Sequence, residues 1–395
     1  MSEIECTKDV AAAWMRGGTS KCWIFATEEL DPSPVALDEL LENALGSGDP
    51  RQIDGVGGGT STTSKVAIVS SSQSSESDVD YIFGQVGIAD RVVEWGSNCG
   101  NCATAIALYA VQEGLIVTNG ERTLVRLRNL NTGAVLHATV ATPQGRVPRS
   151  GGARVAGVAS RGVPVELTFC GPFHVATAFP TGRTRDSVTS GEHTADATIV
   201  SAGAPAILID AVSVGMTASE SSDEIASKRS MLAGFRVVGA QMHRLILPGQ
   251  PAPGAVPKTG LVGPAEDYRT SNGVIVRAEE YDVAVRMLSM HDVHPAIGLT
   301  SAVAVATAAA TPGTVVHCYR KSDSAMLRIG TLSGVIEVEW TTSADGTVQG
   351  VTLHRAARRL ATALLHVPTA SWKERTEGGK PLASADIAQP AVSVR

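Results

Sequence analysis

Two runs of small apolar residues, 103–111 and 302–310, restrict the fold of this chain more than any other feature. Neither run contains a charged residue, and glycine or proline follows each at Gly114 and at Pro312-Gly313. A helix that is apolar on every side has no face for water and is buried inside a domain. Each run is therefore predicted to be a buried helix, and both are too short to cross a bilayer.

Strand-like segments surround both runs, and the pattern of the first half is repeated in the second. A chain of 395 residues is long for one core. We expect α+β architecture with two pseudo-symmetric domains, in which short strands wrap around one central helix and the two helix starts face a shared cleft. The predicted domains are 1–182 and 183–367, with the segment 368–395 completing the first one.

Other segments carry weaker patterns. The polar stretch 181–196 is predicted to be a surface loop or an interdomain passage, and 248–263 a loop rich in proline and glycine. Strands are predicted near 235–238 and 244–247, a helical turn at 282–287, and strands on both sides of the turn Gly203-Ala204-Pro205.

Composition narrows the class of function. The hydrophobic share of 43% and the charged share of 18% are those of a globular protein, and a net charge of −6 disfavours nucleic acid or an anionic membrane as a partner. Six scattered cysteines do not form a disulfide framework. The acidic start Met1–Glu5 lacks an apolar leader core, so we expect a cytoplasmic protein.

The stretch from Ser97 to Cys102 precedes the first buried run. Ser97 or Asn98 is expected to cap the helix, which leaves the amides of Gly100 and Asn101 free to bind an anion. A thiol at Cys99 would have a lowered pKa there. The competing interpretation is a capped core helix that begins with a cysteine. Because a structural zinc site needs a second ligand pair, we expect no metal: one thiol acts and the other packs.

Lys65 follows a run of glycines and hydroxyl residues and opens the strand 66–69. The stretch is neither a Walker loop nor a Rossmann fingerprint, because no helix follows it. With no acid close in sequence, Lys65 is either a desolvated base or a lysine whose head group reaches water. The turn Arg16–Lys21 contains two glycines and two hydroxyl residues and could hold an anion, although a plain strand turn fits equally well.

These motifs together resemble the PrpF family of methylaconitate, oxalomesaconate and aconitate isomerases. The resemblance covers nearly the whole chain and is carried by Arg16-Gly-Gly-Thr-Ser-Lys21, Gln52-Ile-Asp-Gly55, Thr63-Ser-Lys-Val-Ala-Ile-Val69, Ser97-Asn-Cys-Gly-Asn101, Thr300-Ser-Ala302 and Arg355-Ala-Ala-Arg-Arg-Leu360. It implies the diaminopimelate-epimerase-like fold, an active site between two domains and no cofactor. Lys65 and Cys99 match the catalytic positions of the family.

The resemblance implies an isomerase that shifts a C=C bond, by 1,3-allylic proton transfer or cis-trans exchange, in a small unsaturated di- or tricarboxylate. Such a reaction removes a proton beside a carboxylate and returns it elsewhere on the allyl system through a dienolate. The expected substrate-binding residues are Arg16, Thr19, Ser20, Lys21, Thr63, Ser64, Asn98, Gly100, Asn101, Thr300, Ser301 and Ser333. His294 is kept as a further contact, and a homodimer stays open.

The chain departs from the family pattern at three places. Cys22 and Cys102 replace residues that are common in relatives, and Thr331-Leu332-Ser333-Gly334 stands where relatives often have His-Pro-Ser-Gly. We expect Leu332 to make one end of the pocket fit a less charged or bulkier group than aconitate presents. Two other functions stay open: a cofactor-independent racemase or epimerase of the same fold, and a non-catalytic protein that binds small carboxylates.

Overall fold

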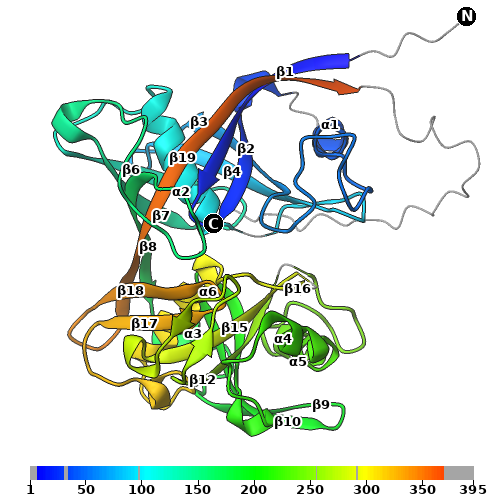
Figure 1. Ribbon diagram of the computed structural model, residues 1–395, viewed down its shortest axis with the longest axis vertical. Coiled ribbons are helices and arrows are strands. Elements are labelled where there is room, and N and C mark those ends of the chain that lie inside the picture. Colours follow the sequence, from blue (N-terminus) through cyan, green and yellow to red (C-terminus); the bar gives the residue numbers. More distant parts are fainter. Residues whose placement is uncertain (1–6, 31–33, 97, 255, 291, 369–395) are drawn as a thin grey trace, which may run out of the picture.

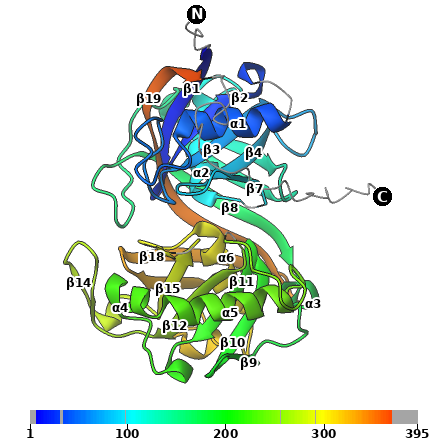
Figure 2. The same ribbon diagram turned by 90° about the vertical axis from the view of Figure 1, so that its right-hand side faces the viewer.

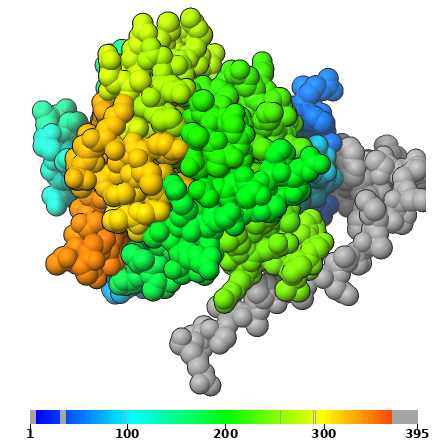
Figure 3. All heavy atoms as spheres, turned by 90° about the horizontal axis from the view of Figure 1, so that it is seen from below, coloured from blue at the N-terminus to red at the C-terminus, as the bar shows by residue number. Residues whose placement is uncertain are grey.

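The computed structural model describes residues 7–30, 34–96, 98–254, 256–290 and 292–368. Two halves are stacked along the long axis, and two long strands run between them (Figures 1 and 2). Each half wraps strands around one helix, as the sequence predicts. Figure 3 views the molecule from the end formed by the second half, whose segments cover most of that surface.

The first half is a closed ring of strands around α2 (Gly100–Gln112). Neighbours in the ring pair with one another, and the last strand pairs with the first. The ring consists of β1 (Thr7–Gly17), β2 (Ser20–Ala26), β3 (Lys65–Ser71), β4 (Val79–Val86), β6 (Arg122–Asn129), β7 (Val135–Ala141), β8 (Val163–Phe173) and β19 (Val348–Pro368). Every residue of α2 from 100 to 111 is buried, because the ring leaves this helix no contact with water.

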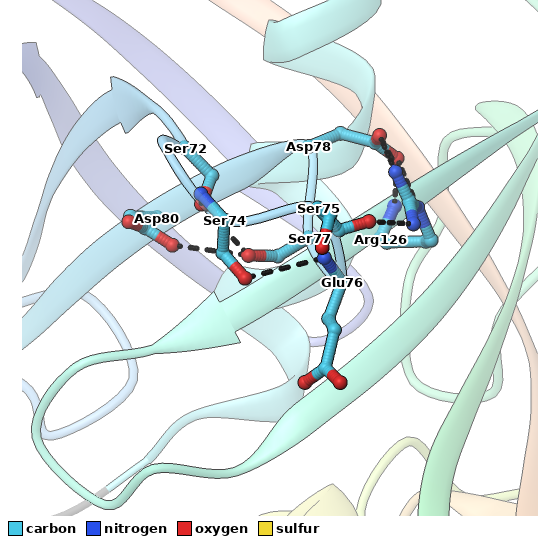
Figure 4. A network of polar contacts seen from close by, with 8 residues as sticks. All are labelled: Ser72, Ser74, Ser75, Glu76, Ser77, Asp78, Asp80 and Arg126. Carbon is cyan, nitrogen blue, oxygen red and sulfur yellow. Dashed lines mark hydrogen bonds and ion pairs between the residues drawn. The ribbon is translucent and has the colours of Figure 1, made fainter.

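Smaller elements cover the outside of this ring. The helix α1 (Pro34–Leu45) packs Leu41 and Leu45 against the outer face, and β5 (Val93–Glu94) extends the edge of β4. The serine-rich loop between β3 and β4 is held by polar contacts (Figure 4). There Arg126 on β6 binds the Asp78 carboxylate, with NH2 at 2.6 Å from Oδ1, and donates to the Ser75 carbonyl at 2.7 Å.

The second half folds a curved sheet around α6 (Leu299–Ala310), of which residues 299–309 are buried. Its strands pair in the order β9 (Asp186–Ser190), β10 (His193–Ala202), β11 (Ala204–Asp210), β12 (Lys258–Pro264), β15 (Val283–Ser289), β17 (Met326–Thr331), β18 (Gly334–Thr342) and β19. Side chains alternate across the sheet: Leu208 faces the core around α6, whereas Ile207 and Ile209 face α5 (Arg229–Met242).

The remaining elements are short. They are α3 (Val175–Ala178), α4 (Ser222–Ser227), β13 (Tyr268–Arg269), β14 (Ile275–Val276), β16 (Asp292–Val293) and 3-10 turns at Thr27–Glu29, Pro143–Gly145, Val212–Val214, Ala278–Glu280 and His317–Tyr319.

Several local predictions were wrong, because each local pattern was outweighed by tertiary packing. Within the predicted loop 181–196, residues 186–190 and 193–196 lie in strands. Residues 235–238 lie inside α5, where Leu232, Phe235 and Gly239 share its buried face. No strand covers 244–247, and the segment 282–287 falls mostly in β15. Within the stretch 248–263, β12 begins at Lys258.

The two halves share β8 and β19. Residues 338–342 of β18 pair with 348–353 of β19, whereas 357–368 of the same strand pair with β1. The predicted domain boundary at residue 367 therefore falls within β19, a strand that belongs to both halves. The segment 369–395, predicted to complete the first domain, lies outside the described residues, so the predicted domain limits stay a prediction.

Candidate active site

The N-terminal ends of α2 and α6 meet at one cavity between the halves, as the sequence predicts. A Cβ atom at position 100 would lie 2.7 Å from the Cβ atom of Leu299. Only glycine at this position therefore allows the two helix starts to approach this closely. The cavity is lined by Ser20, Ser61, Thr62, Lys65, Phe83, Gln85, Asn98, Cys99, Gly100, Asn101, Lys258, Leu288, Met290, His294, Gly298, Leu299, Thr300 and Ser301. None of these lining residues is acidic.

The start of α2 supplies backbone donors. Cys99 is the N-cap, its Sγ accepts from the Cys102 amide at 3.4 Å, and the Ala103 amide donates to the Cys99 carbonyl at 2.8 Å. The amides of Gly100 and Asn101 are thus left outside the helical pattern, next to the cavity. Asn98, one of the two predicted caps, lies one residue before the observed N-cap. The other predicted cap, Ser97, lies outside the described residues.

The start of α6 is built in the same way but without a side-chain cap. Gly298 is the N-cap, and the first helical hydrogen bond runs from the Ala302 amide to the Gly298 carbonyl at 2.9 Å. Thr300 and Ser301 are buried and line the cavity. Two helix starts therefore direct the positive ends of their dipoles at the same space.

Lys65 is the first residue of β3 and lies directly opposite Gln85 of β4. Lys65 is 8% exposed, its Nζ donates to Gln85 Oε1, and the centroid of the Phe83 ring lies 5.2 Å from Nζ. Gln85 is oriented in turn by its Nε2, which donates to the Ser64 carbonyl at 2.8 Å. The head group of Lys65 therefore lies inside the cavity, next to the side chain of Gln85.

The pKa of the Cys99 thiol is shifted in the direction opposite to the expected one. Side-chain hydrogen bonding with Cys102 and then burial raise the pKa of Cys99 well above its usual range, against the smaller opposing effect of Lys65. The helix start was expected to lower this pKa, but burial beside a second thiol outweighs it. Cys99 is thus a protonated donor at neutral pH. Cys102 is 1% exposed and packs in the core.

Two asparagines flank the cysteine. Asn101 Nδ2 donates to Thr19 Oγ1 at 3.1 Å, and its Oδ1 accepts from Arg355 at 3.2 Å, so this side chain ties the β1–β2 turn to α2. Asn98 Oδ1 accepts from the Tyr81 hydroxyl at 2.7 Å. Asn98 Nδ2 is buried and has no hydrogen-bond partner among the described residues.

Among the residues of the lining that can bind or move a proton, sequence reasoning missed Gln85 and Lys258 and left His294 uncertain. Gln85 and Lys258 carried no motif, and Lys258 stood in a stretch that was expected to be a loop. Burial and the nearby Lys65 lower the pKa of Lys258 to about 8. Burial also lowers the pKa of His294 to about 3, and its Nδ1 accepts from the Ala296 amide at 3.0 Å, so a neutral ring lines the cavity with Nε2 as the protonated nitrogen.

Six predicted binding residues lie elsewhere. Arg16 NH1 donates to the Gly18 carbonyl at 3.1 Å and NH2 to the Arg161 carbonyl at 3.2 Å, and Lys21 Nζ lies over the Trp14 ring at 5.1 Å. Their cationic groups are therefore engaged away from the cavity. Also outside its lining are Thr19, Thr63, Ser64 and Ser333. Ser333 instead donates to the Pro295 carbonyl.

The chain matches a known protein family over nearly its whole length. The family model described as PrpF protein matches residues 7–368. This chain belongs to the PrpF family. It is 37% identical to 2-methyl-aconitate isomerase of Shewanella oneidensis over 91% of this chain and 97% of that protein. It is 34% identical to (4E)-oxalomesaconate Delta-isomerase of Novosphingobium sp., over 90% and 96%.

Solved structures show the same fold. A methylitaconate-delta-isomerase superposes with a TM-score of 0.75 at 29% identity, covering 95% of this chain and all of that one. A hydroxyproline epimerase from Agrobacterium vitis, at 12% identity, superposes with a TM-score of 0.51 over 92% and 94%. The expected epimerase-like fold is thereby confirmed, and this PrpF chain is an isomerase.

Two other kinds of feature are absent from the described part of the chain. No cluster of three or more histidine, cysteine or acidic side chains in that part of the chain could hold a metal ion. None of its helices is both long and apolar enough to cross a membrane.

Proposed function

We propose that this PrpF protein moves a C=C bond in a small unsaturated di- or tricarboxylate by 1,3-allylic proton transfer, without a cofactor. One observation carries the proposal: two lysines, a protonated thiol and two helix starts face one cavity whose described lining contains no carboxylate. A site of this kind binds anions and carries protons. The named activities of the relatives support the same class of substrate.

In this mechanism the Lys65 amine takes the proton from the carbon next to a substrate carboxylate. The electron pair of the broken C–H bond moves into the allyl system, and the negative charge of the dienolate lies on the carboxylate oxygens. The amides of Gly100 and Asn101 stabilise that charge. The Cys99 thiol then protonates the distal carbon, which leaves a thiolate beside the Lys65 ammonium. Return of one proton from Lys65 to Cys99 restores the starting state.

The alternatives receive less support. A two-thiol epimerase would need a second thiol at the start of α6, where this chain has Thr300 and Ser301. A protein that only binds carboxylates would not need Lys65 held by Gln85 beside the Cys99 thiol. The five described cysteines are free thiols, which supports the further proposal of a cytoplasmic location.

Proton NMR in D2O tests the reaction. The chelator-treated, dialysed protein is incubated with cis-aconitate, trans-aconitate, 2-methylaconitate, 4-oxalomesaconate and methylitaconate. We expect at least one acid to be isomerised with deuterium incorporated at its allylic carbons, and Lys65→Ala to abolish the exchange. Absence of both turnover and exchange for every acid would favour the binding function, and activity that returns only on adding a cofactor would contradict the mechanism.

A further inference from the structure

A second cavity adjoins the first and contains mostly apolar residues. It is lined by Gly96, Asn98, Thr132, Ala134, Val135, Phe169, Cys170, Phe173, Ser201, Ala202, Gly203, Ala204, Pro205, Val256 and Lys258. We call it the apolar annex. Its volume is about 240 Å³, against about 60 Å³ for the polar cavity that contains Lys65 and Cys99. The polar cavity alone therefore offers little room beyond the reacting carbons and their carboxylates.

Two residues belong to both cavities. Asn98 and Lys258 line the polar cavity and the annex, so they stand at the junction. Within the described part of the chain, Lys258 makes no hydrogen bond or ion pair, and Asn98 Nδ2 is buried without an acceptor. A buried amide without an acceptor is costly unless a ligand supplies one, and the ammonium of the partly buried Lys258 is free to bind the same ligand. A carboxylate at the junction would satisfy both.

Beyond this junction, the walls of the annex contain few groups that could bind a charged group. Phe169 and Phe173 come from β8 of the shared pair, Ala204 and Pro205 from β11, and Ala134 precedes β7. Lys258 is the only charged residue in the described lining of the annex. The annex therefore favours an apolar or neutral group and disfavours a further carboxylate.

We propose that the apolar annex binds a substituent of the substrate, a short alkyl or other neutral group, while Lys258 and Asn98 bind the carboxylate next to the carbon that carries it. This rests on the proposed function and names its substrate class: unsaturated di- or tricarboxylates with one neutral branch. The feature expected to produce this preference, Leu332, is not responsible for it. Leu332 is 2% exposed and lines neither cavity.

Blocking the annex tests the proposal. Ala204→Phe fills it from the second half and Ala134→Phe from the first, whereas Ala159→Phe adds the same ring at an exposed position outside both cavities. The measurement is the ratio of kcat/KM for 2-propylaconitate to kcat/KM for cis-aconitate. A ratio is used because a general loss of folded enzyme cancels from it.

We expect the wild type and Ala159→Phe to favour the propyl substrate, and each blocking variant to lower the ratio by about tenfold or more, the value of a few methylene groups in an apolar pocket. An unchanged ratio in both blocking variants would overturn the proposal. A lowered ratio in only one of them, with the other folded by circular dichroism, would do the same.

A binding measurement separates this proposal from the proposed reaction. Calorimetry compares succinate with 2-propylsuccinate, which cannot be isomerised. Tighter binding of the propyl compound to the wild type, lost in Ala204→Phe, supports the annex even if no acid in the panel is turned over. Equal affinity of the wild type for the two compounds would overturn the annex, whatever the outcome of the turnover experiments.

Discussion

At the residue scale, the cavity places Lys65 and Cys99, the two proposed proton carriers, in unequal environments. Lys65 donates to the amide oxygen of Gln85 and lies beside the Phe83 ring. The strand pairing brings these partners together, because Lys65 and Gln85 are directly opposite in the sheet. Cys99 keeps its proton because burial and Cys102 raise its pKa. A thiol that keeps its proton can serve as the acid of the proposed proton transfer.

Replacing Lys65 tests the role of its amine. We expect Lys65→Ala to lower kcat by about 10²- to 10⁴-fold, the usual contribution of a general base. Lys65→Arg should not restore the rate, because a guanidinium does not lose its proton in this range. Stopped assays with 2-methylaconitate measure kcat, and thermal unfolding checks that both variants fold. A rate within a few fold of the wild type in Lys65→Ala would remove Lys65 from the chemistry.

Lys258 should impose a pH dependence on substrate binding. Its pKa of about 8 means that the ammonium is present below that pH and is lost as pH rises through it. We therefore expect KM for a dicarboxylate to rise above about pH 8. Lys258→Met should raise KM at pH 7 by roughly 10- to 100-fold, equivalent to a charged hydrogen bond of about 1.5–3 kcal/mol, and should flatten the rise.

The control for this pH profile is Lys228→Met, which removes an exposed lysine that lines neither cavity. It should leave KM and its pH dependence as in the wild type. A KM of Lys258→Met that equals the wild-type value at pH 7 would show that the lysine does not bind substrate.

At the element scale, the site depends on how closely the β1–β2 turn approaches α2. A Cβ at Gly17 would lie 1.8 Å from the Asn101 carbonyl oxygen and 2.9 Å from the Ala105 amide nitrogen. Both are helix backbone atoms, which cannot rotate away as a side chain could. The absence of a side chain at Gly17 is therefore what lets β1 lie against the first turn of the helix, next to Cys99.

Gly17→Ala should consequently destabilise the protein by about 1–3 kcal/mol or more, since overpacking of this kind forces backbone shifts. Gly152→Ala is the matched control, because nothing lies within 4 Å of its built Cβ. The control should change the free energy of unfolding by about 0.5 kcal/mol or less. Urea titration followed by circular dichroism measures both values, and equal stabilities of the two variants would refute the close approach.

At the scale of the whole molecule, the halves are joined by strands instead of by a flexible linker. β19 pairs with β18 in the second half and with β1 in the first, and β8 runs beside it (Figure 1). Unfolding of one half would remove pairing partners from strands that also form part of the other half. The cavity between the helix starts is thus held by the same ladder that connects the halves.

We expect the two halves to unfold together. In protein labelled with 5-fluorotryptophan, fluorine NMR follows Trp23 in the first half and Trp340 in the second, both of which are buried. Val303→Ala in α6 should lower stability by about 0.5–3 kcal/mol and shift both signals to the same lower urea midpoint. Separate midpoints for Trp23 and Trp340 would show that the halves are independent.

Much of the candidate site could be predicted because its signals are local. An uncharged run of small residues must be buried wherever it packs, and its first amides must be left open, so α2, α6, Gly100 and Asn101 follow from the pattern itself. Arg16 lies outside the cavity lining because its guanidinium donates to the carbonyls of Ala356 and Arg161, which are distant in sequence. Nothing near Arg16 in the chain indicates those carbonyls.

By itself, the sequence determined the two buried helices and the family motifs that contain Lys65 and Cys99, the proposed proton carriers. Only the tertiary structure decided what surrounds them. The pairing of β11 with β12 places Ala206 opposite Lys258, which brings a lysine from a proline-rich stretch to the junction of two cavities. Burial next to Cys102 then keeps the Cys99 thiol protonated, against the helix dipole. Pairing partners and local dielectric depend on residues far apart in the chain, and that is why no local pattern could supply them.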